Sequence, residues 1–116
     1  MNLSQRNRNP GNLRFAGQKE SICEEYGFAV FPNDPAGWRA LVRQITLDQN
    51  RGDTIRKFIE EYAPSHENDT ASYVAFVCYG LRAEPEDRLV LYSPYAVAGL
   101  IACREGYFAK DSDPPK

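Results

Sequence analysis

The stretch RNRNPGNLRF, residues 6–15, decides how this chain begins to fold. Its centre, Asn9 to Asn12, predicts a tight turn, because Pro10 presets one φ angle and Gly11 permits a positive φ. Asparagine side chains bond back to the local backbone in such turns, so both asparagines are expected to serve the turn first. The apolar residues that follow predict that the chain continues from this turn into a strand.

Short apolar runs flank a polar stretch after the turn. LRFAG (residues 13–17) and YGFAVF (residues 26–31) lie on either side of QKESICEE, and they predict the two strands of a small hairpin. Further along, four segments carry apolar residues at helical spacing. Their expected boundaries are Asn33 or Asp34 to Gly52, Asp53 to Pro64, Asn68 or Asp69 to Gly80, and Ser93 to Gly106. Their expected inner faces are Trp38, Leu41, Val42 and Ile45; Ile55, Phe58, Ile59 and Tyr62; Tyr73, Val74 and Val77; and Val97, Leu100 and Ile101.

These elements predict one α+β domain that is mainly helical, with about four helices and a small β-hairpin. The 116 residues suffice for a single core, so the domain is expected to span residues 1–116, with frayed ends at about 1–5 and 110–116.

Composition excludes several classes of function. The net charge of −2 offers no basic patch for nucleic acid, and a single histidine excludes a multi-histidine metal site. No apolar run approaches the roughly 20 residues that span a bilayer, and the start does not resemble a signal peptide. We therefore expect no nucleic-acid or membrane partner, no metal and no cofactor. The odd count of cysteines, without a CxxC pair, favours free thiols at Cys23, Cys78 and Cys103.

Five ordered motifs carry a resemblance to a known family. NPGNLR, GFAVF, AGWRAL, TIRKFIEEYAP and ENDTASYV, between Asn9 and about Leu81, resemble small domains of bacteriophage structural proteins and of related bacterial proteins. That family looks like a branch of the lysozyme-like superfamily, which cleaves the glycan strands of peptidoglycan. ENDTASYV is similar to a late helix of that superfamily, with Tyr73 at the matching position. NPGNLRF is similar to the turn that follows its catalytic helix.

The catalytic helix itself is missing from its usual place, because only eight residues precede Asn9. GLIACREGYF, residues 99–108, resembles the apolar helix that ends on the catalytic glutamate, with Glu105 at that position. A circular permutation would restore the usual order, and it requires the two ends of the chain to meet. Gly106 and Tyr107 depart from the Ser, Asn or Gly pair that usually follows the glutamate, which weakens the match for catalysis more than for fold.

A glycosidase needs a carboxylic acid that is still protonated near neutral pH. The end of a helix disfavours an ionised Glu105, and Tyr107 and Phe108 are expected to desolvate it. Arg104 would act in the opposite direction, but it is expected to point to another side. Glu20, Glu24 and Glu25 are candidates for a second carboxylate. A lytic transglycosylase, however, can act with one glutamate, and we favour this single-glutamate mechanism. The substrate-binding residues expected with this interpretation are Tyr73, Asn9, Asn12, Gln18 and Tyr107.

The predicted function is therefore cleavage of peptidoglycan glycan strands, as a lytic transglycosylase or muramidase. A phage particle or a bacterial secretion system is expected to deliver the domain to the periplasm or cell wall. The alternative is a non-catalytic phage or prophage domain that keeps the fold for assembly or glycan binding; a protein-bound adaptor is a third possibility. Each residue also has a structural interpretation: Glu105 as a solvated helix end, Tyr73 and Trp38 as core, Glu67 as a helix-end charge, and His66 as surface.

Overall fold

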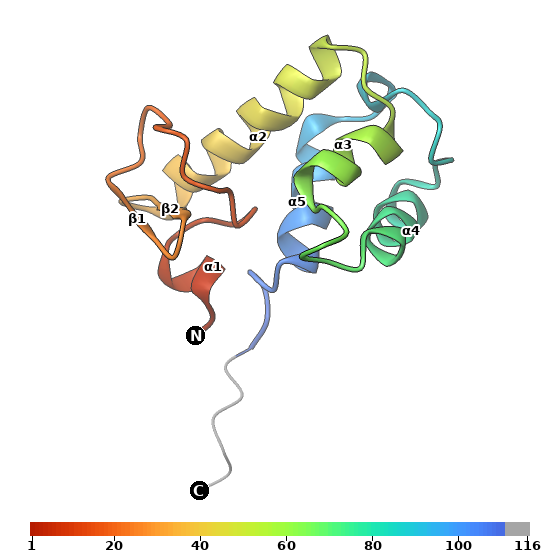
Figure 1. The fold of residues 1–116 in the computed structure, drawn as a ribbon. Coiled ribbons are helices and arrows are strands. Elements are labelled where there is room, and N and C mark those ends of the chain that lie inside the picture. The colour runs from red at the N-terminus through yellow and green to blue at the C-terminus, as the bar shows by residue number, and fades with distance from the viewer. Residues whose placement is uncertain (111–116) are drawn as a thin grey trace, which may run out of the picture.

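Five α-helices and one antiparallel hairpin make up residues 1–110, the part of the chain that the computed structural model describes (Figure 1). The domain is thus α+β and mainly helical, as the sequence predicts. The expected fraying of residues 111–116 lies outside the described residues. The elements are α1 (Leu3–Arg6), β1 (Cys23–Glu25), β2 (Phe28–Val30), α2 (Asp34–Asn50), α3 (Ile55–Tyr62), α4 (Thr70–Leu81), the 3₁₀ helix η1 (Leu89–Leu91) and α5 (Pro94–Arg104).

The four long helices begin at side chains that bond to their first turns. The side chains of Asn33, Thr54, Asp69 and Ser93 each accept a hydrogen bond from a backbone N–H two or three residues later. Pro35 and Pro94 stand in first turns, where a missing N–H costs nothing. One predicted helix end differs from the structure: α4 was expected to end at Gly80, but it continues through this residue to Leu81.

Gly80 lies inside α4 because α5 packs closely against it. A Cβ atom at Gly80 would lie 2.4 Å from a methyl group of Leu100. The helix ends instead with Arg82 in a left-handed conformation, at a φ of 54°.

The hairpin is shifted from its predicted position. Its first strand, β1, falls within the polar stretch, and Cys23 pairs with Val30 while Glu25 pairs with Phe28. The two strands are joined by Tyr26 and Gly27, which both have positive φ angles, as a two-residue hairpin turn requires. The predicted first strand, residues 13–17, forms only an isolated bridge beside β2, because Asn12 and Gly17 at its ends adopt left-handed conformations.

The turn that opens the chain is packed against the helices. Asn9 and Asn12 close it, with the N–H of Asn12 donating to the carbonyl of Asn9 at 3.0 Å. The positive φ of 51° belongs to Asn12, so the conformational role predicted for Gly11 was wrong. Gly11 is needed for close approach instead: a Cβ atom there would lie 2.4 Å from the Tyr62 hydroxyl and 2.6 Å from a methyl group of Leu41.

One hydrophobic core joins the four long helices, η1 and β2. Its centre comes from the inner faces of α2 to α5, where most of the predicted core residues are buried, and Leu13, Ala29 and Phe31 extend it toward the hairpin. Trp38, Val42, Tyr62 and Leu100 are only partly buried against it. The fully buried side chains at its centre are Leu41, Ile45, Ile55, Phe58, Ile59, Val77, Leu89, Val97 and Ile101.

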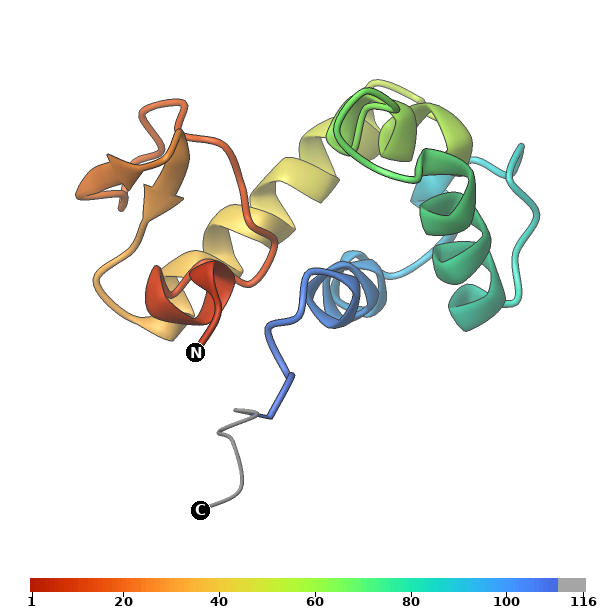
Figure 2. The ribbon, with the colours of Figure 1, turned by 60° about the horizontal axis from the view of Figure 1, so that its bottom comes forward.

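The two ends of the described chain meet. Figure 2 shows the end of α5 lying between α1 and α4. Asn2 caps α1 and donates through Nδ2 to the carbonyl of Gly106 at 2.7 Å, and Gln5 donates to the carbonyls of Tyr107 and Ala109 at 3.0 and 2.6 Å. Residues 1–5, expected to fray, are thus a capped helical turn that holds the chain after α5.

Candidate functional site

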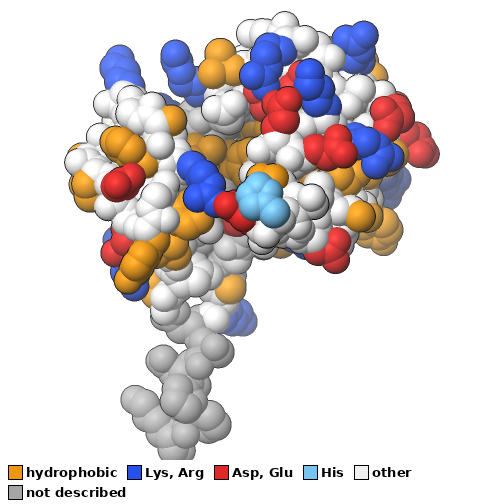
Figure 3. All heavy atoms as spheres, viewed as in Figure 1, with side chains coloured by type: hydrophobic (Ala, Val, Ile, Leu, Met, Phe, Trp, Pro, Cys, Tyr) orange, Lys and Arg blue, Asp and Glu red, His pale blue; other side chains and the backbone are white. Residues whose placement is uncertain are grey.

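A groove of about 880 Å³ runs between the two parts of the molecule. One wall, which we call the turn side, comes from the chain before the hairpin and from β2; its lining residues are Asn12, Leu13, Arg14, Ala16, Gln18 and Phe28. The end of α3 and the loop after it, residues 61–68, form the other wall, which we call the helical side. Figure 3 shows the hollow between these walls, with apolar side chains inside and charged ones at its rim. Its volume is in the range of small-molecule binding sites, roughly 300–1,000 Å³.

Glu105 lies in this groove, where it ends α5. The Tyr73 hydroxyl, from α4, donates to Glu105 Oε2 at 2.8 Å, and Asn12 Nδ2 donates to Glu105 Oε1 at 3.4 Å. The expected meeting of the late glutamate with the early asparagine turn is therefore observed. It depends on three elements that are far apart in the sequence: the turn, α4 and the end of α5.

Burial governs the protonation of Glu105. It raises the pKa of this carboxyl group, while the hydrogen bonds from Tyr73 and Asn12 and the charge of Arg104 lower it, so that the pKa lies above its ordinary value. A raised pKa is what a general acid needs near neutral pH. Burial is also the main cause of the raised pKa of Tyr73, so its hydroxyl stays a proton donor to the carboxyl group.

The neighbours of Glu105 along the chain differ from expectation. Arg104 does not point away: its guanidinium lies 5.2 Å from the centre of the Tyr73 ring and donates to the Ser72 hydroxyl at 3.2 Å. Tyr107 and Phe108 do not enclose the carboxyl group, because both pack against the ring of Trp38.

The predicted substrate-binding residues separate into two groups. Asn12 and Gln18 line the groove, and Tyr73 reaches it through its bond to Glu105. Asn9 is fully buried and cannot touch a substrate, since its side chain bonds to the backbone of Leu13 and Ala29. Tyr107 lies outside the groove lining, and its hydroxyl donates to Asp34.

The three candidates for a second carboxylate do not line the groove either. Glu20 forms a two-pronged contact with Arg39 at 2.8 and 2.6 Å, and Glu25 pairs with Arg6 at 2.6 Å. Glu24 is exposed on β1. The carboxylates that line it beside Glu105 are those of Asp48, Glu61 and Glu67, which sequence reasoning did not select.

Tyr62 is a further groove residue that the sequence did not single out. Its hydroxyl donates to the carbonyl of Gly11 and thereby fixes the turn that carries Asn12. Burial, followed by the charge of Glu105, raises the pKa of Tyr62 well above its ordinary value. Helical spacing places Tyr62 on an inner face but does not show which carbonyl its hydroxyl reaches.

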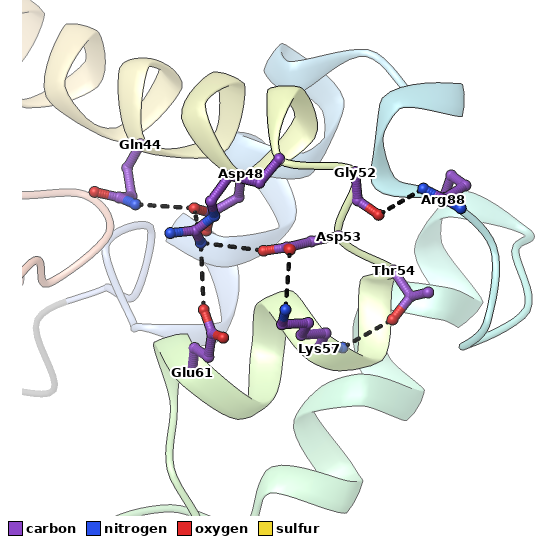
Figure 4. Close-up of polar contacts among 9 residues, drawn as sticks. Gln44, Asp48, Gly52, Asp53, Thr54, Lys57, Glu61 and Arg88 are labelled. Carbon is purple, nitrogen blue, oxygen red and sulfur yellow. Dashed lines mark hydrogen bonds and ion pairs between the residues drawn. The ribbon is translucent and has the colours of Figure 1, made fainter.

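A charged cluster lies at the α2–α3 junction (Figure 4), and three of its residues, Asp48, Arg51 and Glu61, line the groove. Arg51 contacts Asp48, Asp53 and Glu61, the last two at 3.1 and 3.2 Å. Lys57 adds a contact to Asp53 at 3.7 Å. Burial raises the pKa of Asp48. The cluster ties α2 to α3 and gives this end of the groove polar groups that can bind the hydroxyl and amide groups of a ligand.

The other chemistry-bearing residues of the described chain are scattered. Cys23, Cys78 and Cys103 are free thiols, and only Cys78 is buried. Within residues 1–110, no three His, Cys, Asp or Glu side chains are grouped so that they could hold a metal ion. Over the same residues, no helix has the length and apolar character needed to cross a membrane.

Comparison with known proteins adds no relative. The chain matches no protein-family model and no curated protein sequence.

Proposed function

We propose that this domain cleaves the glycan strands of peptidoglycan, with Glu105 as the general acid and base. The observation that carries the proposal is the desolvated carboxyl group of Glu105, which lies in a groove and is held by Tyr73 and Asn12 from two other elements. The resemblance of the motifs to lysozyme-like domains supports the same activity. It also supports delivery to the cell wall by a phage particle or secretion system, which we propose with it.

The chemistry follows from the two oxygens of Glu105. Tyr73 holds Oε2 at 2.8 Å, while the Asn12 contact to Oε1 is longer, at 3.4 Å. We assign the transferred proton to Oε1. It passes to the glycosidic oxygen as the bond to the anomeric carbon breaks, which leaves a carboxylate. That carboxylate then takes a proton from the group that attacks the anomeric carbon.

The attacking group decides the reaction class. In a lytic transglycosylase it is the sugar's own 6-hydroxyl, so the product carries an anhydro ring and no second carboxylate is needed. Glu20, Glu24 and Glu25 lie outside the groove lining. The carboxylates that line the groove beside Glu105, those of Asp48, Glu61 and Glu67, are each paired with an arginine. We therefore favour this route over hydrolysis. Mass spectrometry of the products distinguishes an anhydro end from a reducing end.

The test is clearing of purified peptidoglycan by the wild type and by Glu105→Gln. We expect the variant to lose at least about 100-fold in rate, since positioned acid–base catalysis contributes roughly 10²–10⁴. Glu60→Gln is the matched control, because Glu60 is exposed on α3 and does not line the groove. Equal clearing by wild type and Glu105→Gln would remove Glu105 from the mechanism.

One observation favours a second candidate function, glycan binding without cleavage. Both hydrogen bonds to Glu105 are donated to its oxygens, and both favour the ionised form over the acid. A wild type that sediments with peptidoglycan but releases no fragments would support this alternative.

A further inference from the structure

An ion pair connects the two walls of the groove. Arg14, on the turn side, donates through Nη2 to Glu67 Oε2, on the helical side, although the two residues are 53 positions apart. Both side chains line the groove that contains Glu105. In Figure 3, basic, acidic and histidine side chains meet at the lower edge of the hollow, where they are exposed to solvent. The pair therefore spans the groove at its solvent face.

The partners of this pair are positioned by other contacts. The guanidinium of Arg14 lies 5.0 Å from the centre of the Phe28 ring, on β2, which is within the range of a cation–π contact. His66 Nε2 lies 3.6 Å from the other oxygen of Glu67. The N–H of Glu67 donates to the carbonyl of Pro64 at 3.0 Å, which fixes the loop. The contact thus has support on both walls.

We propose that the Arg14–Glu67 pair is a strap that determines which glycans the site accepts. The inference rests on the proposed function and specifies its substrate class. A short fragment or a free strand end can slide beneath the strap. The interior of a long strand has to enter from the side, and this requires the pair to separate. The site therefore prefers strand ends and short glycan fragments to the interior of intact strands.

The strap opens transiently, because its side chains are 57% and 37% exposed. Exposed ion pairs are weak and are screened by salt. A pair of ordinary strength keeps the closed form in about 1.5- to fourfold excess over the open form. Substrates that need the open form therefore bind about two- to fivefold more weakly, because the factor is the inverse of the open fraction. The preference for short fragments should have this size and should decrease as salt is added.

The experiment compares Arg14→Gln, Glu67→Gln and the charge-reversed double variant, Arg14→Glu with Glu67→Arg, on two substrates. One is intact peptidoglycan sacculi, and the other is a set of short soluble glycan fragments prepared from them. Each variant is assayed for cleavage. Binding to both substrates is also measured in a Glu105→Gln background, so that the result does not depend on catalysis.

We expect each single variant to raise the ratio of sacculus to fragment activity, or binding, about two- to fivefold. The charge-reversed variant should restore the wild-type ratio, because it rebuilds the pair with opposite polarity. A ratio unchanged in the single variants overturns the strap but leaves the proposed function intact. If the charge-reversed variant fails to restore the wild-type ratio, the strap is overturned too, since Arg14 and Glu67 then act by direct contact with the substrate. Absence of binding and cleavage for both substrates refutes the strap and the proposed function together.

Discussion

Replacing Tyr73 with Phe tests the hydrogen bond at the centre of the site without relying on any assumed activity. The substitution removes only the hydroxyl that donates to Glu105 Oε2 at 2.8 Å, from a side chain that is 2% exposed. A hydrogen bond to a charged group contributes about 1.5–3 kcal/mol, and one between neutral groups about 0.5–1.5 kcal/mol. We therefore expect a loss of about 2 kcal/mol in the free energy of unfolding at a pH above the raised pKa of Glu105, where the ionised carboxyl group loses its donor.

The loss should become smaller in acid. Burial raises the pKa of Glu105, so this group is protonated in the folded state at a higher pH than in the unfolded chain. Once it is protonated, Tyr73→Phe removes only a neutral hydrogen bond, and the difference from wild type should fall by about 1 kcal/mol. Urea unfolding of both proteins at mildly alkaline pH and in acid measures this change. The other carboxylates are common to both proteins, so their contributions cancel in the difference.

The matched control is Tyr79→Phe, on the same helix, because Tyr79 is 88% exposed. It should change the stability by no more than about 0.5 kcal/mol at either pH. A loss for Tyr73→Phe that is equal at both pH values, or no larger than that of the control, would refute the charged hydrogen bond that we assign to Glu105.

Two further predictions concern the same site. Glu105→Gln should be more stable than wild type at pH 7, because each unit by which burial raises the pKa of Glu105 costs about 1.4 kcal/mol once the carboxyl group is ionised. That advantage should vanish as the pH falls from the raised pKa toward the ordinary value of about 4.3, and thermal unfolding across this window checks the sign. Gly37→Ala should destabilise the protein by about 1–3 kcal/mol or more, since a Cβ atom there would lie 2.0 Å from the carbonyl oxygen of Arg8. The control for Gly37→Ala in urea unfolding is Gly99→Ala, because Gly99 is helical and a Cβ atom there would face open space. Alanine at this position should stabilise the protein by up to about 1 kcal/mol.

The helices could be predicted because their signals are local. Asn33, Asp69 and Ser93 cap the helices that they were expected to cap, since a capping side chain bonds to a backbone only a few residues away. The meeting of Glu105 with Asn12 and Tyr73 is long-range, and local patterns do not contain it. We expected it from the proposed resemblance of the motifs to lysozyme-like domains, and no local pattern of the sequence predicts it.

The wrong predictions share a physical reason, which is that tertiary contacts overrode a local rule. Gly11 looked like a residue chosen for its φ angle, but the space beside Tyr62 explains it. Asn9 looked accessible in a polar turn, but it is buried as a backbone partner. Glu67 does lie just before α4, as predicted, but only the fold shows that Arg14 stands on the opposite wall.

The contact between α1 and the segment after α5 makes the placement of Glu105 depend on a part of the chain that does not line the groove. Asn2 and Gln5 donate to the carbonyls of Gly106, Tyr107 and Ala109, which follow Glu105 directly. Loss of these bonds would release the backbone on one side of Glu105, while the residues that bond its carboxyl group, Tyr73 and Asn12, stay in place. Damage to α1 can therefore reach the groove although every side chain that lines it is still present.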